Sequence, residues 1–111
     1  MTKATETLFA YGTLLEIPVQ LAVFGRVIQS VPDRLAGYTK IENAVAGRYP
    51  ALNRCQTLNC GVLGARLALN STEWALADAY ETESYYRKLF TLDSGVRAWV
   101  YLASAANQTK A

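Results

Sequence analysis

The stretch Leu8–Leu15, LFAYGTLL, interrupts an apolar run with a tyrosine, a glycine and a hydroxyl group. A glycine after a buried strand lets backbone N–H groups face outward, because no Cβ stands in the way. Gly12, Thr13 and Leu14 would then offer consecutive amide donors, which suit a carboxylate or another anion. A plain turn at a strand end explains the same residues. From these residues alone, the anion-binding loop and the plain turn both remain open.

The segment Leu76–Glu83 supplies a second chemical group, the carboxylate of Glu81, at the end of an expected helix. The negative end of a helix dipole disfavours an ionised carboxylate. Burial beside Tyr80 and Tyr85 would raise the pKa of Glu81 toward the range useful for proton transfer. The alternative is a solvated glutamate just past a helix end. Asp78, on the same helix, is expected to face solvent or to pair with an arginine.

The chain contains no histidine, and this absence narrows the chemistry that the sequence allows. It removes the usual general base, the Ser-His and Cys-His nucleophile systems, and most transition-metal sites. Any reaction must then rest on a carboxylate, a tyrosine, a lysine, a cysteine or backbone groups. Among these groups, Glu81 is the best candidate for a general base.

The run Tyr85–Lys88, YYRK, has two interpretations. Aromatic and basic residues side by side can stack on bases and bind phosphates. The simpler interpretation places one tyrosine in the core and leaves the other half-exposed beside the basic side chains, with Tyr86 lining a pocket. We favour the simpler interpretation.

Cys55 and Cys60 are the two cysteines of the chain, and their spacing matches no zinc signature. A disulfide between them would need an oxidising compartment, which nothing else in the sequence indicates. We therefore predict two reduced thiols in or near the core.

The elements that must position these groups follow an α+β pattern. Hydrophobic periodicity and turn residues predict a strand at Thr7–Tyr11, a helix at Pro18–Gly25, a turn or short extended link at Val31–Asp33, a strand at Leu35–Ile41, an irregular loop at Glu42–Thr57, a strand at Cys60–Leu69, a helix at Ser71–Tyr80, and strands at Tyr85–Leu92 and Arg97–Ala103. Asn70 and Glu73 form a capping-box signature, and Leu69 can staple to Trp74. The turn at 93–95, DSG, predicts a hairpin between the last two strands.

Composition indicates a single globular domain over residues 1–111, with a polar tail at 104–111 that is expected to fray. Hydrophobic residues make up 51% and charged residues 18%, which argues against disorder. The net charge of +2, without a basic block, argues against a nucleic-acid partner. No apolar segment approaches the about 20 residues of a membrane span, and no signal peptide is visible. We expect a cytoplasmic protein without a membrane partner.

Taken in order, these pieces resemble the γ-glutamylcyclotransferase-like (AIG2-like) proteins almost end to end. The matching segments are Tyr11–Leu14, where the family has Y-G-[ST]-x, then Val19-Gln20, Phe24–Arg26, Gly37-Tyr38, Tyr49–Leu52, Gly61–Leu67, Ala77–Glu81 followed by Tyr85–Arg87, and Arg97–Tyr101. No single piece is specific. The ordered set, with the right separations, is the strong signal.

The resemblance implies a mixed β-barrel with flanking helices. It also implies that Tyr11–Leu14 (Tyr11, Gly12, Thr13 and Leu14) bind a γ-glutamyl group and that Glu81 is the general acid/base. Tyr86, which we expect to line the pocket, is a further candidate for substrate binding. The expected activity is cyclisation of a γ-glutamyl amine or peptide, which releases 5-oxoproline and a free amine. Neither a cofactor nor a metal is implied, and the protein would be a monomer or a homodimer. The alternative is a binding module of the same fold without catalysis.

Overall fold

The computed structural model describes residues 5–57 and 59–104. Its helices, strands and 3-10 turns (η) are β1 (Thr5–Ala10), η1 (Thr13–Leu15), α1 (Ile17–Phe24), β2 (Ser30–Ala36), β3 (Tyr38–Val45), β4 (Tyr49–Arg54), β5 (Gly61–Asn70), α2 (Ser71–Glu81), η2 (Thr82–Ser84), β6 (Tyr85–Thr91) and β7 (Arg97–Ala103). The tail that was expected to fray lies outside the described residues, apart from Ser104.

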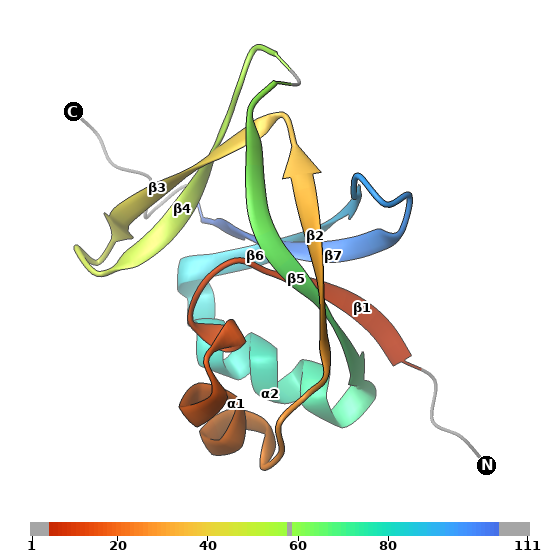
Figure 1. Cartoon of the computed structure of the whole chain (residues 1–111). Coiled ribbons are helices and arrows are strands. Elements are labelled where there is room, and N and C mark those ends of the chain that lie inside the picture. The colour runs from red at the N-terminus through yellow and green to blue at the C-terminus, as the bar shows by residue number, and fades with distance from the viewer. Residues whose placement is uncertain (1–4, 58, 105–111) are drawn as a thin grey trace.

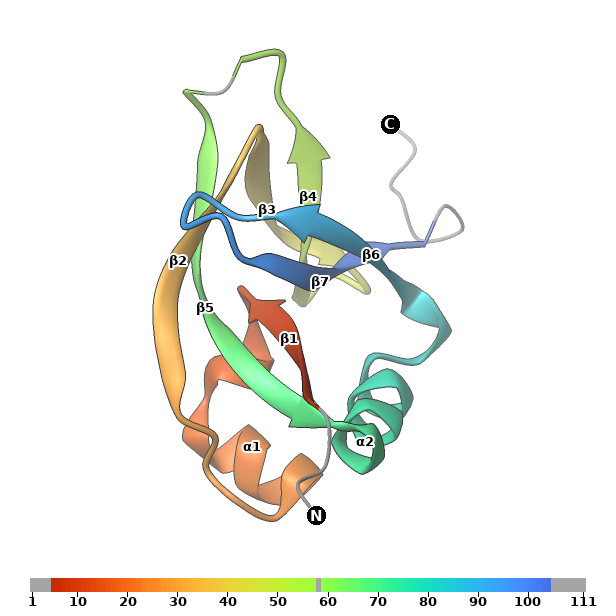
Figure 2. The ribbon, with the colours of Figure 1, turned by 90° about the vertical axis from the view of Figure 1, so that its right-hand side faces the viewer.

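Five strands form one mixed sheet in the order β2-β5-β1-β7-β6 (Figures 1 and 2). Only β1 and β7 pair in parallel, whereas the other neighbours are antiparallel. Strands β3 and β4 form a separate two-stranded hairpin. The α+β class is therefore confirmed. The expected barrel is not confirmed, because no ladder among the described strands joins the edge strands β2 and β6.

The second half of strand β1 is buried on both faces. Successive side chains of a strand point to opposite faces. Leu8 packs into a cluster with residues of the two helices, whereas Phe9 packs into a second cluster with β2, β6 and β7. Both side chains are completely buried. The end of β1 is therefore packed from two sides, and the loop Tyr11–Leu14 starts directly after it.

Helix α2 begins where the capping box predicts. The Asn70 side chain accepts a hydrogen bond from the Glu73 backbone N–H, and the Glu73 carboxylate accepts one from the Asn70 N–H. Glu73 also takes two hydrogen bonds from Arg26, which follows α1. Trp74 and Ala77 lie on the inner face of α2 and pack into the core. These contacts set the position of the helix whose last residue is Glu81.

Three predictions between residues 31 and 57 differ from the structure. Val31–Asp33 belong to strand β2, and the expected strand Leu35–Ile41 is split at Gly37, whose φ is +86°. The expected loop 42–57 instead contains the end of β3 and all of β4. Most side chains of β3 are polar or exposed, so the sequence shows no apolar alternation there. The hairpin forms by pairing between β3 and β4, and Ala46 and Gly47 turn it with positive φ.

The prediction of two reduced thiols is also wrong, because Cys55 and Cys60 form a disulfide. Their Cα atoms lie 6.3 Å apart, within the range that a disulfide spans. Gly37 brings the ends of this loop together: its N–H donates to the Cys60 carbonyl, and its carbonyl accepts from the Cys55 N–H. The disulfide therefore closes the connection between β4 and β5.

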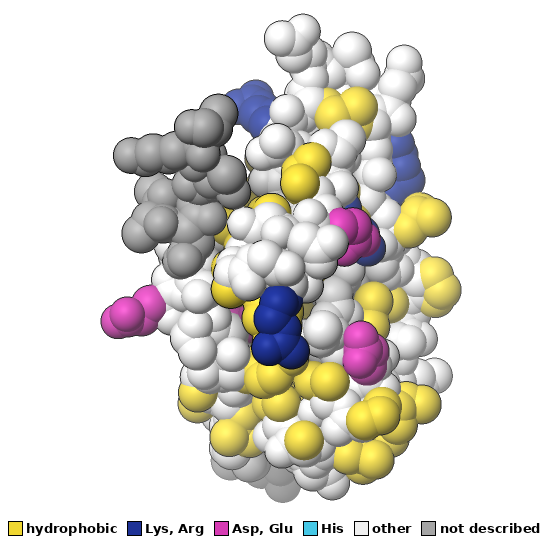
Figure 3. All heavy atoms as spheres, turned by 90° about the vertical axis from the view of Figure 1, so that its left-hand side faces the viewer, with side chains coloured by type: hydrophobic (Ala, Val, Ile, Leu, Met, Phe, Trp, Pro, Cys, Tyr) yellow, Lys and Arg dark blue, Asp and Glu magenta, His cyan; other side chains and the backbone are white. Residues whose placement is uncertain are grey.

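Helix α1 is apolar on its outer side as well as toward the core. Its buried residue is the polar Gln20, whereas Ile17 and Leu21 are at least half exposed. Figure 3 shows hydrophobic side chains gathered on the lower part of one face of the molecule. Among the described residues, neither helix has the length and apolar character that crossing a bilayer requires.

Replacement of Asn70 by alanine tests the role of the cap. The change leaves the Glu73 N–H without its side-chain acceptor, and we expect the free energy of unfolding to fall by about 1 kcal/mol. Urea denaturation of Asn70→Ala against the unmodified protein measures this. Asn53→Ala, at an exposed position of β4, is the control and should change stability by less than about 0.5 kcal/mol. Equal losses in the two variants would contradict the cap assignment.

Candidate active site

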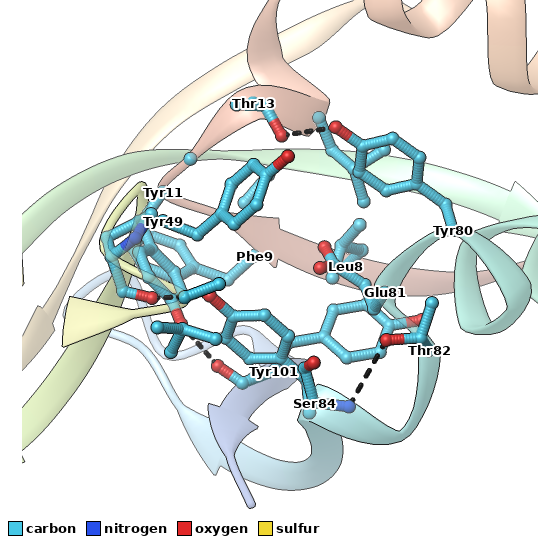
Figure 4. A pocket seen from close by; sticks show the side chains of 17 residues that line it. Leu8, Phe9, Tyr11, Thr13, Tyr49, Tyr80, Glu81, Thr82, Ser84 and Tyr101 are labelled. Carbon is cyan, nitrogen blue, oxygen red and sulfur yellow. Dashed lines mark hydrogen bonds between the residues drawn. The ribbon is translucent and has the colours of Figure 1, made fainter. Parts of the chain in front are cut away.

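A cavity of about 220 Å³ lies between the end of β1, the tip of the β3–β4 hairpin and the C-terminal end of α2 (Figure 4). This volume is below the roughly 300–1,000 Å³ of sites for drug-sized ligands, so it suits a small molecule. Its lining comprises Leu8, Phe9, Ala10, Tyr11, Gly12, Thr13, Leu14, Val45, Ala46, Tyr49, Pro50, Tyr80, Glu81, Thr82, Ser84, Tyr85 and Tyr101. Glu81 is the one charged residue of this lining.

The loop from Tyr11 to Leu14 forms one wall. The Leu15 N–H donates to the Gly12 carbonyl and closes the turn η1. Within the described part of the chain, the N–H groups of Thr13 and Leu14 have no acceptor, as expected for the first amides of a helical turn. A Cβ on Gly12 would lie 3.3 Å from Pro50 Cγ, so glycine allows the hairpin to approach the loop closely. The loop thus presents amide donors beside the cavity.

Gln20 supports this loop from behind. Its side-chain N–H donates to the Leu14 carbonyl at 2.9 Å, and its side-chain oxygen accepts from the Ile28 N–H at 2.9 Å. Both polar atoms of a buried side chain are therefore satisfied. The carbonyl of Leu14 is occupied by this contact, which orients the peptide units of the loop.

Glu81 forms the opposite wall and points into the cavity (Figure 4). Burial in these largely apolar and aromatic surroundings raises the pKa of the Glu81 carboxyl to about 7. Near neutral pH this group can both accept and donate a proton. The helix ends directly after it, because Thr82 adopts a positive φ of +60° that breaks the helical path. The Thr82 hydroxyl accepts from the Ser84 N–H and holds this turn.

Five tyrosines line the cavity together with Glu81, and the hydroxyl groups of three of them donate hydrogen bonds to protein oxygens. Tyr11 donates to the Tyr101 carbonyl, Tyr85 to the Pro50 carbonyl, and Tyr101 to the Asp78 carboxylate. Burial raises the pKa of Tyr85 to about 12, and burial is also the largest cause of the raised pKa of Tyr11. These phenols therefore stay neutral near pH 7, and their oxygens remain available as acceptors.

A further hydrogen bond joins the two walls. The Thr13 hydroxyl lies 2.7 Å from the Tyr80 hydroxyl, and either oxygen can be the donor (Figure 4). The residue before Glu81 is thereby connected to the loop that presents the amides. The two segments that sequence reasoning singled out are adjacent in space, although about seventy residues separate them.

The structure places Tyr11, Gly12, Thr13, Leu14 and Glu81 at the cavity. Tyr86 is half exposed and does not belong to the lining, whereas Tyr85 does. Neighbouring residues of a strand face opposite sides, so only one of the two tyrosines of β6 can face inward.

Sequence reasoning missed the part of the lining that the β3–β4 hairpin and β7 supply. Tyr49 and Pro50 were assigned to an irregular loop, and Tyr101 to a strand without a site role. The signal that could have found them is their place in the matching segments Tyr49–Leu52 and Arg97–Tyr101. Within the described residues, no group of three His, Cys, Asp or Glu side chains is placed to hold a metal ion.

Comparison with known proteins gives a family and a fold. Residues 8–111 match the family model described as gamma-glutamyl cyclotransferase, AIG2-like. No curated relative matches the chain.

Solved structures of low sequence identity share the fold. A solution structure from Arabidopsis thaliana has a TM-score of 0.76 at 22% identity and covers 93% of this chain, which spans 66% of that protein. A second Arabidopsis thaliana structure has a TM-score of 0.76 at 19% identity, covering 100% of this chain and 78% of its own. The crystal structure of a uropathogenic E. coli-specific protein has a TM-score of 0.71 at 22% identity, with 96% and 84% covered.

The raised pKa of Glu81 predicts a pH dependence of stability. Glutamate has an ordinary pKa of 4.5, so between this value and about 7 the folded protein holds a proton that the unfolded chain releases. The stabilisation is complete below pH 4.5 and is lost as the pH rises through 7. The stability of the unmodified protein minus that of Glu81→Gln should therefore fall by up to about 3 kcal/mol over this window. Urea denaturation at several pH values measures it, and a flat difference would contradict the shift.

Proposed function

The chain belongs to the gamma-glutamyl cyclotransferase, AIG2-like family, and from this premise we propose that it cyclises a γ-glutamyl amine or peptide. The products are 5-oxoproline and a free amine. The observation that carries the proposal is the position of Glu81: one carboxylate with a pKa near 7, in a small cavity whose opposite wall presents backbone amides.

The mechanism needs one proton acceptor and a folded substrate. Glu81 takes a proton from the α-ammonium group of the substrate. The freed amine attacks the γ-carbonyl carbon of the same molecule, and a five-membered ring closes. The attacking nitrogen still carries two hydrogens and must lose one to become the lactam N–H. Glu81 returns the first proton to the leaving nitrogen as the bond between that nitrogen and the γ-carbon breaks. It then takes the second proton from the ring nitrogen and passes it to the released amine, which departs as an ammonium ion. The substrate supplies its own nucleophile, so the absence of histidine is no obstacle.

The polarity of the cavity suits such a substrate. An α-ammonium group needs acceptors, and the Glu81 carboxylate and the phenol oxygens supply them. A carboxylate or a developing oxyanion needs donors, and the amides of Thr13 and Leu14 supply these. Ring closure is intramolecular, so holding the folded conformer accounts for much of the task.

A panel of γ-glutamyl amino acids and γ-glutamyl alkylamines, analysed by mass spectrometry for 5-oxoproline, tests the proposal. We expect turnover of at least one compound, and a fall in kcat of about 10²–10⁴-fold in Glu81→Gln, because the general acid/base is lost. Glu83→Gln is the matched control: this exposed side chain lies two residues further on and should leave kcat unchanged.

Two outcomes would contradict the proposal in different ways. Equal activity of Glu81→Gln and the unmodified protein would remove the role of Glu81 but keep the reaction. Binding of γ-glutamyl compounds in calorimetry, without turnover of any of them, would favour a binding module of the same fold.

A further inference from the structure

An ion pair lies behind the cavity wall, one helical turn before Glu81. The Asp78 carboxylate accepts two hydrogen bonds from Arg87, at 2.9 Å from Nε and 3.2 Å from Nη2. Residues three apart on a helix are neighbours, so Asp78 and Glu81 share one side of α2. The proposed reaction gives this pair no role.

The cation of this pair is held in place by two indole rings. The Arg87 guanidinium carbon lies 4.3 Å from the centre of the Trp74 ring and 4.9 Å from that of the Trp99 ring. The Trp99 indole N–H is in turn bound by Glu6 of β1 at 2.9 Å. A guanidinium between two aromatic faces has little freedom to leave its carboxylate. The pair is partly exposed, with 30% of the Arg87 side chain and 46% of the Asp78 side chain accessible, and the two rings hold the guanidinium beside its carboxylate.

Tyr101 connects this ion pair to the cavity. Its hydroxyl donates to Asp78 Oδ1 at 2.6 Å, and its side chain belongs to the cavity lining. Burial is the largest cause of its raised pKa, and the charges of Asp78 and Glu81 both add to it. The Tyr101 phenol is thus the group that contacts the Asp78 carboxylate and also lines the cavity that contains Glu81.

We propose that Asp78 and Arg87 are positioning residues that keep the electrostatic field at Glu81 close to neutral. The carboxylate of Asp78 holds Tyr101 against the cavity, and the guanidinium of Arg87 cancels the charge that this carboxylate would otherwise direct at Glu81. The effect on the reaction rests on the proposed function, whereas the effect on the ionisation of Glu81 does not.

Among the described residues, the lining of the cavity holds no charged side chain besides Glu81 itself. Beyond the lining, Lys40 of β3 donates to the Tyr11 carbonyl at 3.5 Å and is paired with Glu42, whereas Asp78 and Arg87 are connected to the lining through Tyr101. The titratable groups of the lining are Tyr11 from β1, Tyr49 from β4, Tyr80 from α2, Tyr85 from β6 and Tyr101 from β7. Behind them lie Asp78, Arg87 and Glu6, and the effect of Glu6 falls on Arg87. Burial opposes the charge of Asp78, but hydrogen bonds from Arg87 and Tyr101 hold its pKa below the ordinary value. Asp78 therefore stays ionised while Glu81 titrates.

Two single substitutions should shift the pKa of Glu81 in opposite directions. Asp78→Asn leaves the Arg87 cation uncompensated, which favours ionised Glu81 and lowers its pKa by about one unit. Arg87→Gln leaves the Asp78 anion uncompensated and raises the pKa of Glu81 by about one unit. The double variant should return it toward the value of the unmodified protein. Carbon-13 NMR of carboxyl-labelled glutamate follows the titration, with the Glu81 signal assigned from its loss in Glu81→Gln.

Shifts of the same sign in both single variants, or no shift in either, would overturn the proposal, since a merely structural role gives no opposite signs. Arg87→Lys keeps the positive charge and should leave the pKa of Glu81 near its original value. If Arg87→Gln does not fold, Asp78→Asn against Arg87→Lys still decides the question.

Activity measurements separate this proposal from the proposed function. If the protein turns over a γ-glutamyl compound, the acidic limb of the kcat/KM profile should move down in pH for Asp78→Asn and up for Arg87→Gln. If the unmodified protein turns over no compound, the proposed function fails, while the NMR titration still tests the ion pair.

Discussion

The position of the site depends on the hydrogen bonds that the Glu73 carboxylate accepts. This carboxylate accepts hydrogen bonds from the backbone at the start of α2 and from Arg26, just after α1. The Glu73 side chain is buried, whereas the Arg26 side chain is half exposed. Loss of Arg26 would deprive the buried carboxylate of two hydrogen bonds, so these contacts favour one arrangement of the two helices. Because α2 is short and packs through Trp74 and Ala77, fixing its start also fixes Glu81 at its end.

Local signals were enough to predict the elements that carry the two main parts of the site. The capping box at Asn70, the apolar runs of β1 and β5, and the turn at 93–95 lie within a few residues of what they specify. The region 31–57 could not be predicted in this way. Strand β3 gains its structure from pairing with β4, and the break at Gly37 depends on hydrogen bonds to Cys55 and Cys60. The disulfide forms because Gly37, far away in the sequence, brings Cys55 and Cys60 together, and the spacing of the two cysteines does not predict this.

The residues of the candidate site likewise fall into those that local sequence predicts and those that depend on distant pairing. Gly12 and Glu81 could be predicted because the residue types themselves carry the chemistry: a backbone without a side chain, and a carboxylate at the wrong end of a helix dipole. Whether Tyr85 or Tyr86 faces the cavity depends on the register of β6 with β7, which pairs Tyr85 with Ala103 and Tyr86 with Leu102. A shift of one residue would exchange their faces, and no local pattern at YYRK specifies the register.

The hydrogen bonds of the tyrosines have a consequence for how hydrogen moves in the cavity. Tyr11, Tyr85 and Tyr101 each give their proton to a protein oxygen, so none of the three has one to lend to a ligand. In the proposed reaction, Glu81 is the group that accepts a proton from the bound ammonium. The Glu81 carboxylate accepts protons from the substrate's α-nitrogen and donates them to the leaving nitrogen. Each turnover would then leave Glu81 in the protonation state in which it began. The reaction would take up no net proton from bulk water.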